Sequence, residues 1–200
     1  MPPVTRALIV ANVVVFLLQS VANHLLVIHL ALWPVDAGIF SPGGFQPWQL
    51  VSYSFLHGGL THLLFNMFAL YMFGGELERL FGTRRFTQLY FISVVAAGLS
   101  QLAFSAVAGG EAYPTVGASG GVFGLLLAYG MYFPRRTLML LFPPIPMPAW
   151  LFVTLYGGIE LFLGVTGTQA GVAHFAHLGG MLGAWLLIRH WRSRSARWPR

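Results

Sequence analysis

Six apolar runs of membrane-spanning length are the feature that most constrains the fold of this chain. They lie at about 7–32, 58–77, 86–108, 116–133, 149–166 and 172–190. A helix that crosses the hydrocarbon core of a bilayer needs about 20 mostly apolar residues. Because the 200 residues are 56% hydrophobic and only 8% charged, the runs leave no room for a soluble domain. We therefore expect one all-α, polytopic membrane domain of six spans over 1–200, with a basic tail at 191–200.

The positions of the basic residues predict how these spans are oriented. All eleven are arginines. They lie before the first span, between the second and third spans, between the fourth and fifth spans, or at the end of the sixth span and beyond it. These residues are Arg6, Arg79, Arg84, Arg85, Arg135, Arg136, Arg189, Arg192, Arg194, Arg197 and Arg200. Arginine and lysine gather on the cytoplasmic side of membrane proteins, so both termini are predicted to be cytoplasmic. The net charge of +6 is thereby explained without a nucleic-acid partner.

The N-terminal run predicts a retained span, because it is longer than the apolar core of a signal peptide and lacks an A-x-A cleavage site. No transit-like presequence precedes it, which favours a prokaryotic inner membrane over an organelle. The chain contains no cysteine, which excludes disulfides, thiol nucleophiles and thiolate metal sites.

Spans two, four and six would all enter the membrane from the outer side. His62, Ser119 and His177 each lie a few residues inside the start of one of these spans. At about 1.5 Å of rise per residue, they share a depth of roughly 5–8 Å below the outer surface. Polar residues inside a bilayer are functional candidates by default, although hydrogen bonding between helices is the alternative interpretation.

Ser119 lies in Gly117-Ala118-Ser119-Gly120-Gly121 at the start of span four. A serine among glycines in a membrane helix usually serves packing. Here the glycines would also admit a substrate backbone to the hydroxyl. The free N–H groups and the dipole of the helix N-terminus would favour an oxyanion.

A serine nucleophile needs a base, and His177 lies at matching depth on span six. Small residues at Gly179 and Gly183, at Gly180 and Ala184, and at Gly120 and Gly124 would let spans four and six approach closely. His174 is the rival base, one turn nearer the surface. The greater depth of His177 and its place on the glycine face favour it.

His62 and Asn66 are four residues apart and share one face of span two. Together with the backbone N–H of Ser119, these two neutral donors would stabilise a developing oxyanion, and the alternative is a structural hydrogen-bonded pair. His57 is expected just outside the span, at the membrane interface.

The glutamates have different expected roles. Glu76 and Glu78, near the inner end of span two, are expected to pair with Arg79, Arg84 or Arg85. Glu160 lies within span five with no basic residue in reach along the helix. It is protonated, hydrogen-bonded across helices or exposed to a water-filled cavity, and the sequence leaves these three open.

Other hydrolytic chemistries are excluded by counting. Asp36 is the only aspartate, so an aspartyl dyad is excluded. No H-E-x-x-H motif occurs, and a zinc site would need three or four histidines without the usual general base, so we expect neither a metal nor a cofactor. Serine with histidine remains.

At these residues the chain closely resembles the rhomboid family of intramembrane serine proteases, over about 47–190. The motifs that carry the resemblance are the run from His57 to Asn66, Gly-Gly-Glu-Leu-Glu-Arg-Leu-Phe-Gly at 74–82, Gly117-Ala-Ser-Gly120 and His177-Leu-Gly-Gly180. Each falls on the expected span and in the expected order.

The resemblance implies that Ser119 is the nucleophile and His177 its base, in a dyad without an acidic third member. It implies oxyanion roles for His62 and Asn66 and a structural role for Glu78. Two positions depart from the family pattern. Gln49 follows Trp48 where some members carry Trp-Arg, and Phe123 occupies a position that can be tyrosine, from which it could stack on His177.

The function expected from this resemblance is cleavage of single-span or polytopic membrane proteins near the outer face of the lipid bilayer. A catalytically silent, client-binding relative and a small proton-coupled transporter that uses Glu160 and the histidines are the competing functions. The sequence does not indicate the oligomeric state.

Overall fold

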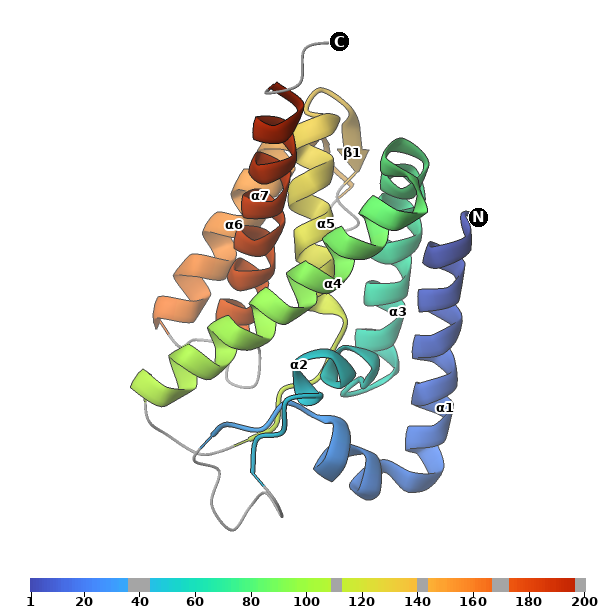
Figure 1. Ribbon diagram of the computed structural model, residues 1–200, viewed down its shortest axis with the longest axis vertical. Coiled ribbons are helices and arrows are strands. Elements are labelled where there is room, and N and C mark those ends of the chain that lie inside the picture. Colours follow the sequence, from blue (N-terminus) through green and yellow to red (C-terminus); the bar gives the residue numbers. More distant parts are fainter. Residues whose placement is uncertain (36–43, 109–112, 140–143, 167–172, 197–200) are drawn as a thin grey trace.

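The apolar runs fold as helices in the computed structural model, which describes residues 1–35, 44–108, 113–139, 144–166 and 173–196. In chain order the elements are α1 (Pro3–Leu30), α2 (Gln49–Ser52), η2 (Tyr53–Phe55), α3 (Leu60–Ala69), η3 (Leu70–Gly74), α4 (Gly75–Ala108), α5 (Ser119–Tyr132), β1 (Thr137–Met139), β2 (Pro146–Pro148), α6 (Ala149–Thr166) and α7 (His174–Ala196). Figure 1 shows the longer helices gathered side by side, with the start of α1 and the end of α7 toward the same end of the bundle.

The chain reverses direction at Gly82, between the second and third apolar runs. Gly82 has φ of 74° and ψ of 162°, a conformation that a residue without a Cβ adopts without strain. Helix α3 continues through the π-helical turn η3 into the first turns of α4, and beyond Gly82 the rest of α4 runs back along the bundle (Figure 1). The runs predicted at 58–77 and 86–108 are therefore two helical legs joined by a tight reversal.

Helix α5 lies at the centre of the bundle and packs against α4 and α7. Eight of its residues are buried, from Gly120 to Tyr129. Its 14 residues correspond to about 21 Å at 1.5 Å per residue, which is shorter than a hydrocarbon core of about 30 Å. The helix begins at Ser119 rather than at the predicted 116, so the serine occupies its first position.

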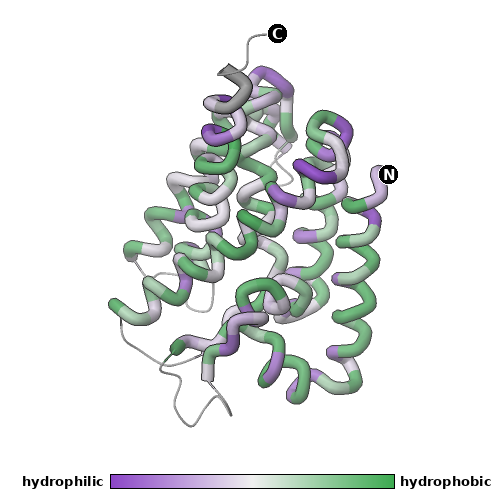
Figure 2. The backbone as a smooth tube through the Cα atoms, viewed as in Figure 1, coloured by the Kyte–Doolittle hydropathy of each residue, from purple (hydrophilic) through white to green (hydrophobic). Residues whose placement is uncertain are grey.

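The outer surface of the bundle is apolar. On α1, Leu17 and Val21 are exposed, as are Phe162 and Val165 on α6, and Figure 2 shows hydrophobic residues along the outside of these helices. Within the described residues, three helical stretches are long and apolar enough to cross a membrane, namely Pro3–Leu30, Leu60–Val107 with the Gly82 reversal inside it, and Ala149–Thr166. Such a surface is suited to lipid and not to water.

Two segments outside the predicted spans contain regular structure. Within the proline-rich segment 134–148, β1 pairs with β2 in an antiparallel hairpin. Helix α7 continues through Ala196, so residues 191–196 are helical and not part of a tail. Near this end Arg85 lies over the ring of Trp191 and Arg192 over that of Tyr132.

Candidate active site

Ser119 and His177 are brought together although they are 58 residues apart in the chain. The Oγ of Ser119, at the first position of α5, lies 2.8 Å from the Nε2 of His177 in the first turn of α7. His177 is buried and Ser119 half-buried. A serine hydroxyl within hydrogen-bond reach of an imidazole nitrogen is the geometry that serine hydrolysis needs.

The close approach of α5 and α7 depends on Gly120 and Gly180. A Cβ on Gly180 would lie 2.0 Å from the carbonyl oxygen of Gly120, so any side chain there would push the two helices apart. Gly179 faces a different neighbour, because its Cβ would lie 2.2 Å from the Oγ of Ser100 on α4. The small-residue pattern of span six thus serves two helix contacts, of which the one through Gly180 aligns His177 with Ser119.

Gly117 brings the ring of His62 close to the serine. Its φ of 129° lies in the region that favours glycine. A Cβ at this position would lie 2.7 Å from the Cε1 of His62 and 3.6 Å from the Oγ of Ser119. His62 therefore borders the space in front of the hydroxyl.

Asn66 lies one turn after His62 on the same face of α3. The amide Nδ2 of Asn66 donates to the carbonyl oxygen of His62 at 3.0 Å, so its bond goes to the backbone and not to the imidazole. Asn66 is 5% exposed and, like His62, lines the same cleft as Ser119. Both side chains are available to a charge that develops beside the serine.

Phe123 stacks on His177, with ring centroids 4.2 Å apart and ring planes 7° apart. The phenylalanine lies one turn after Ser119 on α5. The stacking was expected from the family resemblance, and it limits rotation of the imidazole.

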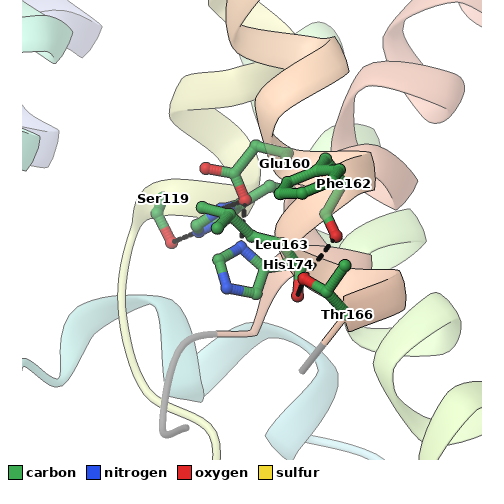
Figure 3. A network of polar contacts seen from close by, with 7 residues as sticks. Ser119, Glu160, Phe162, Leu163, Thr166 and His174 are labelled. Atoms are coloured by element: carbon green, nitrogen blue, oxygen red, sulfur yellow. Dashed lines mark hydrogen bonds and ion pairs between the residues drawn. The ribbon is translucent and has the colours of Figure 1, made fainter. Parts of the chain in front are cut away.

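Glu160 is hydrogen-bonded across helices and also borders the same cleft as Ser119, so the hydrogen-bonding and cavity alternatives that the sequence left open are not exclusive. Its Oε2 lies 2.8 Å from the Nδ1 of His177 and 2.7 Å from the Nδ1 of His174. Figure 3 shows Ser119, Glu160 and His174 gathered around this network. The expectation of a dyad without an acidic neighbour therefore differs from the structure. Sequence spacing could not reveal the contact, because it joins side chains of two separate helices, α6 and α7.

Glu160, His174 and His177 are also the described residues that could hold a metal ion, with their ligand atoms within 4.8 Å of one another. Ligand atoms bound tetrahedrally to zinc at about 2.0–2.1 Å lie about 3.3 Å apart. The observed separations of 2.7 and 2.8 Å between Nδ1 and Oε2 fit hydrogen bonds better.

A cleft of about 740 Å³ opens in front of this cluster. Its polar wall includes His62, Asn66, Ser119, Glu160 and His177. The remaining lining is mostly apolar and comes from α3, η3, α5, α6 and the hairpin, for example Phe65, Phe152 and Leu138. The volume is in the range of sites that bind ligands or short peptide segments, about 300–1,000 Å³.

A sequence model of the Rhomboid domain matches residues 44–193. The chain belongs to the rhomboid family. This assignment agrees with the apolar, mostly helical fold, and the protein is an integral membrane protein.

Several relatives carry the name Rhomboid protease GlpG. The chain is 28% identical over 198 residues to the protein of Yersinia pestis (strain Pestoides F), a match that covers 97% of this chain and 64% of the relative. The proteins of Yersinia enterocolitica serotype O:8 and Yersinia pseudotuberculosis serotype I are 28% and 27% identical over the same shares of each chain. This rhomboid chain thus spans somewhat less than two thirds of the length of these relatives.

Glu78 caps the first helix of this rhomboid instead of pairing with the arginines near it. Its carboxylate accepts the backbone N–H groups of Val4 at 3.0 Å and Thr5 at 2.7 Å, and the hydroxyl of Thr5 at 2.7 Å. Glu76 pairs with Arg136, which precedes the hairpin, and not with Arg79, Arg84 or Arg85. The expected ion pairs were wrong because the observed partners of Glu78 and Glu76 lie far from them in the sequence, in the first turn of α1 and just before β1.

Glu78→Ala is expected to destabilise the fold, because it leaves donors in the first turn of α1 without an acceptor. Hydrogen bonds to a charged group contribute about 1.5–3 kcal/mol, so the apparent melting temperature in detergent should fall by several degrees. Glu76→Ala is the control, since its partly exposed ion pair contributes little. Equal melting temperatures for the Glu78 variant and wild type would contradict the capping role.

The loop after α1 is anchored by Gln49, the residue that departs from the family pattern. The Oε1 of Gln49 accepts the backbone N–H groups of Gln46 at 3.2 Å and Trp33 at 3.3 Å, and the side chain is 1% exposed. Trp48 donates its indole N–H to the carbonyl of His29 at 2.9 Å.

His57, expected at the interface, is instead buried with its ring against that of His62.

Proposed function

We propose that this chain is an intramembrane serine endopeptidase. The observation that carries the proposal is the 2.8 Å hydrogen bond from Ser119 to His177 at the wall of the cleft. The names of the Yersinia relatives support the same activity. Residues 1–200 would form one six-span membrane domain.

In the proposed reaction, the Oγ of Ser119 attacks a substrate carbonyl while the Nε2 of His177 accepts the hydroxyl proton. His62, Asn66 and the backbone N–H of Ser119 would stabilise the oxyanion, with help from the dipole at the start of α5. His177 then protonates the leaving amine. Water enters, and the same base activates it to release the acyl group.

The proposed substrates are single-span or polytopic membrane proteins, cut near the outer face of a bacterial inner membrane. Within a helix, the scissile carbonyl is hydrogen-bonded to the N–H four residues on and is shielded from attack. The substrate segment must therefore unwind before it enters the cleft, so helix-breaking residues should mark the cleavage site.

Cleavage of a transmembrane reporter in liposomes tests this function. Wild type should cut the reporter and Ser119→Ala should not, although both should melt at the same temperature. A catalytically silent member of the family would leave the reporter intact with either protein, and that result would overturn the proposal.

Loss of an oxyanion donor should act on turnover more than on binding. His62→Ala and Asn66→Ala should each lower kcat by about 10²–10³-fold with little change in KM, because their hydrogen bonds strengthen only as charge develops. Steady-state kinetics on the reporter measures both constants. A rise in KM equal to the fall in kcat would indicate a structural pair instead.

Cysteine labelling in intact cells tests the proposed orientation, and the cysteine-free chain makes the test direct. Tyr113→Cys, before α5, should react with an impermeant thiol reagent added from outside, whereas Arg135→Cys, after α5, should react only after lysis. Both side chains are exposed. Labelling of position 135 from outside would reverse the orientation predicted from the arginines.

A further inference from the structure

The carboxylate of Glu160 lies deep in the bundle, and its described polar contacts are with two histidines. The side chain belongs to the otherwise apolar α6, and the residue is 8% exposed. Among the ion pairs between described residues, those of Glu160 are with His174 and His177 only. A buried carboxylate that served packing alone would be costly.

The contact between Glu160 and His177 fixes which ring nitrogen of His177 can act as the base. An ionised carboxylate only accepts hydrogen bonds, so the Nδ1 of His177 must carry a proton and donate it to Oε2. The Nε2 of the neutral imidazole is then unprotonated and faces the Oγ of Ser119 at 2.8 Å. This is the tautomer that can accept the hydroxyl proton.

His174 holds the carboxylate from the other side. Its Nδ1 lies 2.7 Å from the same oxygen of Glu160, and the side chain is 5% exposed. Gly164 allows α6 and α7 to approach here, since a Cβ on Gly164 would lie 3.1 Å from the Cβ of His174. Two converging donors restrict the position of Oε2 more than one donor would.

We propose that Glu160 is a positioning residue that extends the pair to a Ser119–His177–Glu160 triad, with His174 as the support of the carboxylate. The inference rests on the proposed protease function. It assigns roles to the two residues whose function the sequence left open.

In this triad Glu160 keeps its negative charge throughout the reaction. As the bond from the Oγ of Ser119 to the substrate carbon forms, the hydroxyl proton moves to the Nε2 of His177, and the imidazolium is stabilised by the adjacent carboxylate. The proton then passes to the leaving nitrogen as the peptide bond breaks. In the second half, water gives a proton to Nε2 as its oxygen bonds to the acyl carbon, and that proton returns to the Oγ of Ser119 as the ester bond breaks and the new carboxyl terminus leaves.

Glu160→Gln separates charge from shape, because the amide oxygen can still accept from both histidines while the negative charge is lost. We expect Glu160→Gln to lower kcat about 10–100-fold and Glu160→Ala to lower it more, within the 10²–10⁴-fold range of general-base catalysis. KM should change less than threefold in both variants, because the stabilisation that is lost acts on the transition state and not on the bound substrate. Glu160→Asp should recover part of the activity lost in Glu160→Ala.

The matched control is Glu76→Gln, which makes the same chemical change at a glutamate paired with Arg136 away from the cluster. It should retain wild-type kcat and KM. Melting temperature and gel filtration in detergent show whether each variant is folded, and Glu160→Gln carries the test if the alanine variant does not fold. A folded Glu160→Gln with wild-type kcat would overturn the inference.

His174→Ala tests the support of the carboxylate. It should lower kcat several-fold, far less than His177→Ala, and should have no further effect in the Glu160→Ala background because the two residues act together. An effect as large as that of His177→Ala, or an additive effect in the double variant, would contradict the assigned role.

Three outcomes distinguish the sources of failure. If EDTA abolished wild-type activity and zinc restored it, the cluster would be a metal site and the triad would be wrong. If wild type did not cleave the reporter, the proposed function would fail and this inference with it. If wild type cleaved and the Glu160 variants matched it, the inference alone would fail.

Discussion

Ser119→Ala and His177→Ala should each lower kcat by about 10⁶-fold, to below detection, and the double variant should be no worse than either single one. The reason is that the 2.8 Å bond from Oγ to Nε2 makes the two side chains one unit, so either loss removes the whole proton transfer. Cleavage of the liposome reporter by purified variants measures the effect.

The control for this prediction is His24→Ala. His24 is an exposed histidine of α1 that is far in the sequence from the residues that line the cleft. It should leave activity unchanged, and all four proteins should share one melting temperature. A double variant that is measurably slower than both single variants would show that serine and histidine act independently.

Gly180→Ala should have the second largest effect, because no space exists for the added methyl group. Its Cβ would lie 2.0 Å from the carbonyl oxygen of Gly120, so α7 must move away from α5 and carry His177 with it. A displacement of about 1 Å in a catalytic group can lower the rate about 10²-fold, and overpacking destabilises a fold by about 1–3 kcal/mol.

Gly158→Ala is the matched control, since a Cβ at that helical glycine meets nothing within 4 Å. Thermal unfolding and reporter cleavage should show loss in Gly180→Ala and none in Gly158→Ala. If the two variants behaved alike, the close contact of α5 and α7 would not be what aligns the site.

Hydropathy was enough to predict a mostly helical, apolar fold, because a helix in lipid must satisfy its backbone internally and must present apolar side chains. The run at 149–166 matches α6 residue for residue. The start of α5 was placed at 116 instead of Ser119, since hydropathy does not register the backbone of Gly117. That glycine has a non-helical φ of 129° and donates its N–H to the carbonyl of Tyr53 at 3.0 Å.

Within the candidate site, the sequence indicated those contacts that depend on depth and on small residues. The pairing of Ser119 with His177 and the stacking of Phe123 are of this kind. The contacts that were missed join side chains of separate helices. The rotation of α6 about its axis decides whether Glu160 meets His177, lipid or water, and the rotation of α4 directs Glu78 to the start of α1; neither rotation is encoded in a hydropathy pattern.

The measurement that most directly tests the central claim is the site of covalent modification by a fluorophosphonate, which reacts with an activated serine. Wild-type protein treated with the probe in detergent, digested and analysed by mass spectrometry should carry the adduct on Ser119. Ser119→Ala and His177→Ala should remain unmodified. An adduct on another serine, equal labelling of Ser119→Ala, or no labelling of folded wild type would contradict the claim that His177 activates Ser119.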